Sequence, residues 1–182
     1  MVGGQDELVF DGASFALNRC GEIVLQLAEF KEQIACIEYR DGDLAKGAIA
    51  PERSIEASVY DALCLGVKDY IGKNGFPGVL LGLSGGIDSA LTLCIAVDAL
   101  GADKVHAVMM PSQYTADISI EDAQAMADSL RVKYSVIPIK PVFDSFLCAL
   151  APEFKNTRID TTEENLQARI RGTMLMALSN FF

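Results

Sequence analysis

Residues 79–89 read Val-Leu-Leu-Gly-Leu-Ser-Gly-Gly-Ile-Asp-Ser, and this stretch is the most informative of the chain. Its apolar first half predicts a buried β-strand, and the run 90–97 that follows predicts an α-helix. The turn between them, residues 84–89, contains two adjacent glycines. Free backbone N–H groups in the first turn of a helix, together with the helix dipole, favour a bound anion. The stretch therefore predicts a phosphate-binding loop.

The side chains of this loop suit a nucleotide that carries magnesium. Gly85 and Gly86 allow the backbone to approach a phosphate closely. Ser84 and Ser89 add hydroxyl donors, and Asp88 supplies a hard oxygen ligand of the kind that Mg²⁺ prefers. The loop is not a Walker A motif, because that motif requires a lysine and this loop has none.

Length and composition predict a soluble globular protein. The chain has 182 residues, of which 51% are hydrophobic and 22% are charged, so one domain with a real core is expected. No apolar run approaches the roughly 18 residues of a membrane span, so no membrane partner is expected. Residues 1–7 lack the basic and apolar regions of a signal peptide. The formal charge of −10 disfavours a nucleic-acid partner, whose binding surface would be basic.

The cysteines and the histidine predict neither a disulfide framework nor a metal centre. The five cysteines form no C-x-x-C pair and have mostly apolar neighbours, so we expect buried free thiols in a reducing cytoplasm. They are Cys20, Cys36, Cys64, Cys94 and Cys148. The one histidine, His106, lies in an apolar run, which favours a packing role over a catalytic one.

The first third of the chain differs in pattern from the rest. Short strands are expected at Glu7–Phe10, Ser14–Leu17, Glu22–Ala28 and Ile34–Tyr39. The polar stretch 41–54 contains glycines and a proline and predicts a linker. Ser54 predicts the N-cap of a helix that runs from Ile55 to about Asn74.

From residue 79 onward, predicted strands alternate with predicted helices. The strands are 79–83, 105–110 and 134–139, and the helices are 88–99, 119–130, 143–149 and 162–178. This alternation predicts an α/β fold with a parallel, doubly wound sheet and helices on both faces. Ligands of such sheets bind beyond the carboxyl ends of the strands. Residues 84–89 and 110–115 both follow predicted strands there.

Three motifs together indicate a family. The S-G-G-x-D-S loop resembles that of the ATP pyrophosphatase (PP-loop) superfamily, whose members transfer AMP from ATP to a substrate and release pyrophosphate. Residues 110–115, Met-Pro-Ser-Gln-Tyr-Thr, resemble the M-P-S-x-Y-[ST] segment of NAD synthetases. Residues 164–172, Glu-Asn-Leu-Gln-Ala-Arg-Ile-Arg-Gly, resemble their E-N-x-Q-A-R-x-R-G helix. Residues 2–12 look like a late segment of the nitrilase-type glutaminase domain, so the chain resembles glutamine-dependent NAD synthetases.

The resemblance implies a domain order and two missing parts. Residues 1–45 would be a terminal strip of the glutaminase domain, and residues 46–182 would be the PP-loop synthetase domain. The glutaminase catalytic residues and the family's T-G-N-K-S-E segment are not in this sequence. We therefore expect a fragment that lacks most of the glutaminase domain and the C-terminal part of the synthetase domain, without glutaminase activity.

The resemblance also implies a reaction and a site. The family amidates nicotinic acid adenine dinucleotide to NAD with ATP, through an adenylated intermediate, using ammonia or glutamine nitrogen. Ser84 and Asp88 would be catalytic, Asp88 would also bind Mg²⁺, and Asn165 and Arg169 would bind the dinucleotide. The ATP-binding residues would be Gly82, Leu83, Ser84, Gly85, Gly86, Ile87, Asp88 and Ser89. In the family, the helix with Asn165 lies near a dimer interface, so a homodimer or larger homo-oligomer is expected.

Other interpretations remain open from the residues alone. Residues 110–115 could be only a proline turn after a strand, and residues 162–172 only a solvated amphipathic helix. The protein could be another PP-loop enzyme, such as a GMP synthetase or a tRNA-modifying enzyme, although the acidic charge argues against tRNA. It could also be a nucleotide-binding fragment without catalytic activity.

Overall fold

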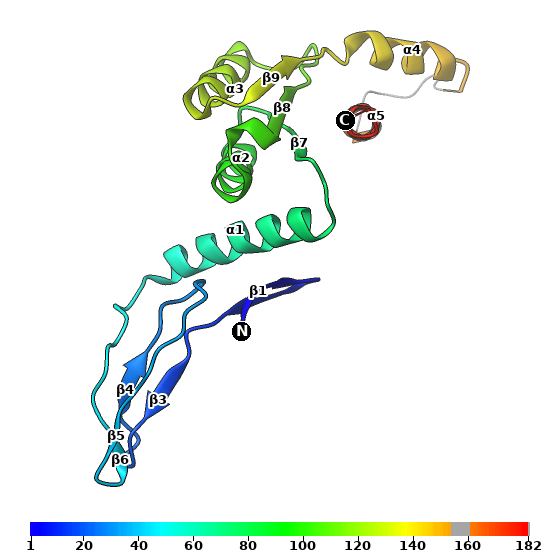
Figure 1. The fold of residues 1–182 in the computed structure, drawn as a ribbon. Helices are drawn as coiled ribbons and strands as arrows, with labels where there is room; N and C mark the ends of the chain where they lie inside the picture. The colour runs from blue at the N-terminus through cyan, green and yellow to red at the C-terminus, as the bar shows by residue number, and fades with distance from the viewer. Residues whose placement is uncertain (154–160, 182) are drawn as a thin grey trace. The chain divides into compact units, whose positions relative to one another are not determined.

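The computed structural model describes residues 1–153 and 161–181 and separates into two compact units, Met1–Gly75 and Phe76–Phe182 (Figure 1). The first unit consists of three short hairpins and a helix, and the second is an α/β unit. The boundary between the two compact units follows the helix of residues 55–73, whereas the domain boundary predicted from the sequence lies at residue 45. The helix lies with the hairpins because it contacts the first of them.

The strands of the first unit pair as antiparallel hairpins, and Gln26 of β4 also forms an isolated parallel bridge with Ile49. The pairs are β1 (Val2–Gln5) with β2 (Leu8–Asp11), β3 (Phe15–Leu17) with β4 (Ile23–Gln26), and β5 (Tyr39–Arg40) with β6 (Asp43–Leu44). Strands are therefore present near the first three predicted positions. The predicted strand Ile34–Tyr39 is wrong: residues 34–38 form no strand, and Ile34 is 99% exposed with no surface to pack against.

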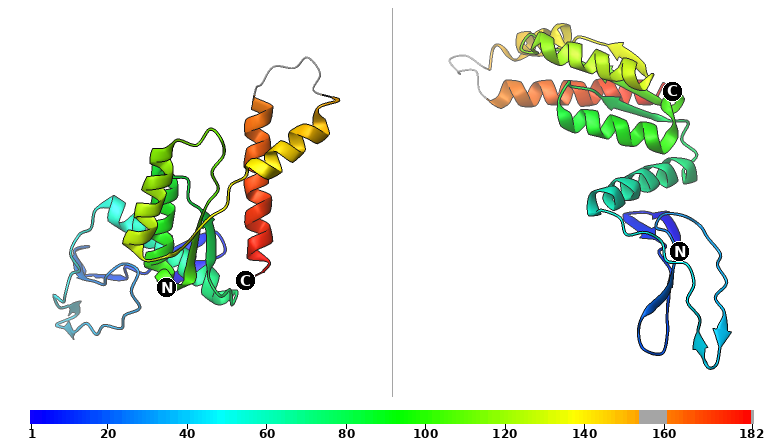
Figure 2. Two further views of the ribbon diagram at one scale, coloured as in Figure 1. Left: turned by 90° about the horizontal axis from the view of Figure 1, so that it is seen from above. Right: turned by 90° about the vertical axis from the view of Figure 1, so that its left-hand side faces the viewer.

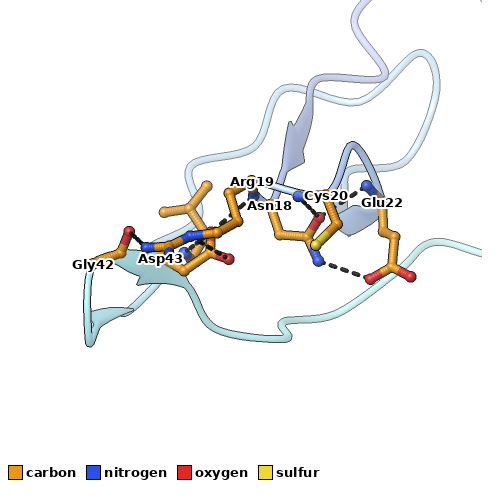
Figure 3. A network of polar contacts seen from close by, with 7 residues as sticks. Asn18, Arg19, Cys20, Glu22, Gly42 and Asp43 are labelled. Carbon is orange, nitrogen blue, oxygen red and sulfur yellow. Dashed lines mark hydrogen bonds and ion pairs between the residues drawn. The ribbon is translucent and has the colours of Figure 1, made fainter.

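The predicted linker 41–54 begins as a tight hairpin. Asp41 and Gly42 join β5 to β6 with φ angles of 51° and 82°, the left-handed geometry that glycine adopts without strain. Arg19, in the turn between β3 and β4, meets this hairpin: its backbone N–H donates to Asp43 Oδ1 at 3.0 Å and its guanidinium donates to the Gly42 carbonyl (Figure 3). Within the β3–β4 turn itself, Asn18 Oδ1 accepts a hydrogen bond from the Cys20 N–H at 3.0 Å. These exposed contacts align two turns and add little stability.

Helix α1 (Ile55–Lys73) begins and ends where the sequence predicts. The Ser54 side chain accepts a hydrogen bond from the Ala57 N–H at 3.2 Å, which satisfies one free donor of the first turn. The β1–β2 hairpin is tied to α1 because the Gly4 N–H donates to Asp69 Oδ2 at 2.8 Å. This hydrogen bond lowers the pKa of Asp69, since it favours the ionised carboxylate.

The second unit is built on a parallel sheet of three strands in the order β7-β8-β9, which confirms the predicted fold class. The strands are β7 (Val79–Gly82), β8 (Val105–Met109) and β9 (Lys133–Val136). The helices are α2 (Ile87–Leu100), α3 (Asp117–Leu130), α4 (Lys140–Leu150) and α5 (Thr161–Ser179), with a 3₁₀ turn at Ala102–Lys104.

Alternation along β8 divides the core into two layers. Val105 and Ala107 point to the face that α2 and α3 cover, where Leu93 is fully buried. Val108 points to the opposite face, which α4 and α5 cover with the buried Phe143. The left view of Figure 2 shows α2 and α3 on one side of the sheet and α5 on the other. Burying one such large side chain contributes roughly 1.5–3 kcal/mol, so both layers hold the strand ends in place.

His106 lies near the amino end of β8, away from the phosphate loop. Its Nε2 is 2.9 Å from Ser135 Oγ on the neighbouring strand, and burial, with a smaller effect of Lys133, lowers the pKa of the imidazole. The expectation of buried cysteines is wrong. All five are free thiols, but Cys20, Cys36 and Cys148 are exposed and the other two are only half-buried. Over residues 1–153 and 161–181, every helix is too short or too polar to span a bilayer.

Candidate functional site

The phosphate loop leaves the sheet one residue after β7 ends. Leu83 is buried, and its N–H donates to the Val108 carbonyl at 2.9 Å, so the β7–β8 pairing continues to this residue. The two serines then close the loop: the Ser84 N–H donates to Ser89 Oγ at 3.2 Å, and the two hydroxyl oxygens are 3.1 Å apart. The Ser89 hydroxyl also donates to the Gly86 carbonyl at 2.9 Å. The loop conformation is thus fixed by its own polar side chains.

The structure explains why glycine occupies both position 85 and position 86 of the loop. Gly85 has a φ of +80°, and a Cβ at this position would lie 2.2 Å from the carbonyl oxygen of Ser119 in α3. Any side chain there would displace the loop from α3. Gly86 is the N-cap of α2, and no side chain in residues 1–153 and 161–181 makes a capping hydrogen bond to this helix. The N–H groups of the first turn are therefore available to a phosphate.

Asp88 is the second residue of α2 and is exposed. Over the described residues, its carboxylate makes no hydrogen bond or ion pair, and no cluster of three potential metal ligands is present. A Mg²⁺ ion that binds with a nucleotide needs only one or two protein carboxylates, because phosphate oxygens and water complete its shell. Asp88 fits that role.

A cavity of about 370 Å³ adjoins the loop at the carboxyl ends of β7 and β8. Its lining is mostly apolar and consists of Gly82, Leu83, Ser84, Val108, Met109, Met110, Thr115, Arg171 and Leu175. Gly82 lies against two other residues of the cavity wall: a Cβ at this position would lie 3.4 Å from Met110 Cε and 3.5 Å from Leu175 Cδ1. An apolar cleft with a few polar groups on its wall suits a nucleoside.

The segment after β8 forms another wall of this cavity. The Ser112 N–H donates to Thr115 Oγ1 at 2.9 Å, and the Tyr114 N–H donates to Ser112 Oγ at 3.2 Å. These hydrogen bonds fold the segment into a turn in which Thr115 lines the cavity and Tyr114 is exposed. The two segments that the sequence predicts at the carboxyl edge of the sheet therefore meet in one site.

Helix α5 contributes a residue that the sequence interpretation did not select. Asn165 and Arg169, the predicted dinucleotide ligands, are exposed and do not line the cavity. Arg171 does line it, and its Nε donates to the Met110 carbonyl at 3.1 Å. Arg171 lies one helical turn beyond the buried Gln167 on the same face of α5. Tertiary packing determines which face of α5 is buried, so helical spacing alone does not single out Arg171.

The parallel sheet and the glycine loop at a strand-to-helix junction define an α/β protein of the PP-loop fold. A sequence model of the NAD synthase family matches residues 59–182. The chain belongs to the NAD synthase family.

Known relatives agree with this assignment. The chain is 50% identical to the glutamine-dependent NAD(+) synthetase of Acinetobacter baylyi over an alignment of 183 positions, which covers 100% of this chain and 34% of that protein. The solved structure of the Acinetobacter baumannii glutamine-dependent NAD⁺ synthetase in complex with ADP matches with a TM-score of 0.97 and 50% identity. That match covers 100% of this chain and 35% of the other.

A second solved structure, the NH₃-dependent NAD synthetase of Campylobacter jejuni, matches 71% of this chain and 54% of its own with a TM-score of 0.62 and 29% identity. The chain thus spans about a third of the length of these curated relatives.

Proposed function

We propose that this chain binds ATP for the amidation of nicotinic acid adenine dinucleotide to NAD. The reaction would pass through an adenylated carboxylate, with release of pyrophosphate and then of AMP. The observation that carries the proposal is that Ser84 belongs both to the phosphate loop and to the wall of the nucleoside-sized cavity. One ligand with an apolar end and a polyphosphate end can therefore occupy both. The relative with 50% identity whose structure contains ADP supports the same ligand class.

In this proposal, each part of ATP has its own contacts. The adenosine occupies the cavity beside Gly82 and Leu83, and the pyrophosphate lies on the N–H groups of Gly85 to Ser89, with Ile87 in the first helical turn. Ser84 and Asp88 lie beside the reacting phosphates and have the catalytic roles. Mg²⁺, held by Asp88, would neutralise charge on the phosphate oxygens. Since little covalent work is required of the protein, positioning and electrostatic stabilisation would provide most of the rate.

The dinucleotide would bind outside the cavity, along the exposed face of α5. The Arg169 guanidinium donates to the Asn165 carbonyl at 3.1 Å, so the two residues form one exposed polar surface. Such a surface gains a defined pocket if a second copy of the chain covers it. We therefore propose a homodimer in which α5 lies near the interface. Two classes of partner are not expected: nucleic acid, given the net charge of −10, and membrane.

The domain division and the nitrogen source follow the same relatives. We propose that residues 1–45 belong to a nitrilase-type glutaminase domain and residues 46–182 to the synthetase domain, in a cytoplasmic enzyme. The family match beginning at residue 59 and the glutamine-dependent relatives support this division. Ammonia would come from glutamine in the whole protein and could be supplied directly to this chain.

Exchange of labelled pyrophosphate into ATP tests the proposal, since it requires a reversible adenylation. We expect exchange with nicotinic acid adenine dinucleotide and not with nicotinic acid mononucleotide, xanthosine monophosphate or tRNA. Arg169→Ala should reduce the exchange while leaving ATP binding, measured by calorimetry, within about twofold of the wild type, because the guanidinium would contact the second substrate.

Exchange that depends on another acceptor would contradict the assignment of substrate. ATP binding without exchange with any acceptor would show a nucleotide-binding chain without the proposed activity.

A further inference from the structure

We propose that Arg171 binds the phosphate of the nucleotide that is attached to the ribose, the α-phosphate of ATP. This inference rests on the proposed function, in which the adenosine occupies the cavity next to the loop.

The guanidinium is held at the cavity wall by the main chain. Its Nε donates to the Met110 carbonyl at 3.1 Å, across the junction of α5 with the end of β8. An arginine that is fixed through Nε presents its two Nη groups in a known plane. Because Arg171 lines the cavity, this fork is available to a ligand there.

No acidic group of the described chain neutralises this cation. Arg171 is half-buried, and the described residues provide neither an ion pair to it nor a second hydrogen-bond acceptor. Burial lowers the pKa of the guanidinium, which remains charged. A partly desolvated cation without a counter-charge is unfavourable, and an anion bound beside it would remove that cost through charge-assisted hydrogen bonds.

The order of groups in the site indicates which anion this is. Among the described residues that line the cavity, Arg171 is the one with a charged side chain, while Ser84 connects the cavity to the phosphate loop. A nucleotide with its base in the cavity and its outer phosphates on the loop must place its first phosphate between them. The loop has no lysine or arginine of its own, so Arg171 supplies the cationic group there.

Calorimetric titrations with adenosine, AMP and ATP separate this role from a structural one. We expect Arg171→Gln to weaken AMP and ATP binding roughly tenfold or more, as for the loss of a charged hydrogen bond, and to change adenosine binding by less than about twofold. Arg171→Lys keeps the charge but loses the Nε–H group. Its affinity for AMP should therefore lie between that of the wild type and that of Arg171→Gln. Arg131→Gln, which removes an equal charge from an exposed helix end, should leave all three affinities unchanged.

The outcomes distinguish this inference from the proposed function. Equal weakening of adenosine and AMP would show that Arg171 only shapes the cavity, and unchanged AMP binding in a folded Arg171→Gln protein would show that it makes no contact. Either result overturns the role of Arg171 and leaves the proposal that the wild-type chain binds ATP unaffected. A wild-type chain that binds none of the three ligands would overturn the proposed function and the inference with it. Thermal unfolding of each variant shows whether it is folded.

Discussion

A methyl group at position 82 tests the assignment of the nucleoside cavity. In Gly82→Ala the new Cβ would lie 3.4 Å from Met110 Cε and 3.5 Å from Leu175 Cδ1, which are ordinary van der Waals distances. The residue has no left-handed φ, so the backbone accepts alanine. The folded protein should therefore keep its stability or gain up to about 1 kcal/mol.

The bound nucleoside, in contrast, would have to share its space with this methyl group. Overpacking of a well-filled site costs roughly 1–3 kcal/mol, which corresponds to about 5- to 150-fold in affinity. The affinities for adenosine and ATP, measured by calorimetry, should fall by a similar factor, because the methyl group would contact the nucleoside and not the phosphates. The matched control is Gly72→Ala in α1, where a Cβ would meet nothing within 4 Å and affinity should not change. Wild-type affinity in a folded Gly82→Ala protein would refute the assignment.

Three further predictions concern the loop, the metal and pH. Gly85→Ala should lower both the melting temperature and ATP affinity, because its Cβ would lie 2.2 Å from the Ser119 carbonyl oxygen; an unchanged melting curve would contradict this packing. Asp88→Asn should weaken ATP binding in Mg²⁺ about tenfold and have little effect in EDTA; equal loss in both titrations would remove the metal role. The pKa of Asp69 is lowered chiefly by the Gly4 N–H, so folding gains stability above the ordinary carboxyl pKa, near 3.8, and loses it as pH falls through the lower folded value. Acid unfolding should therefore show about 1 kcal/mol of pH dependence that Asp69→Asn removes, and an identical pH profile would contradict it.

The sequence was most informative where one periodicity applied over a whole element. In the second unit, β7 and β8 are short apolar runs, and the helices that follow them have helical spacing, so element order and sheet type were predictable. In the first unit, the two-residue strands β5 and β6 are too short for any period to show. Ile34–Tyr39 has strand-like composition, but composition does not provide a neighbouring strand, and Ile34 remains in solvent.

The site shows a similar division. The loop 84–89 was predictable because a strand, two glycines and a helix occur within a few residues. The cavity was not, since it depends on how α5 packs against the ends of β7 and β8, which brings together Met110 and Arg171, 61 residues apart in sequence. Motif comparison selected Arg169, and tertiary packing turned Arg171 to the cavity instead.

Amide hydrogen exchange of the chain with and without Mg·ATP locates the bound ligand along the sequence, so it shows whether ATP binds at the carboxyl edge of the sheet. We predict protection at Gly85–Ser89 and at the turn 112–115, with no change in the β1–β2 hairpin. A second cavity, of about 450 Å³, lies at the amino ends of the strands around Phe76 and His106 and provides an internal comparison. Protection there, or no protection at the loop under saturating Mg·ATP, would contradict an ATP site at the carboxyl edge of the sheet.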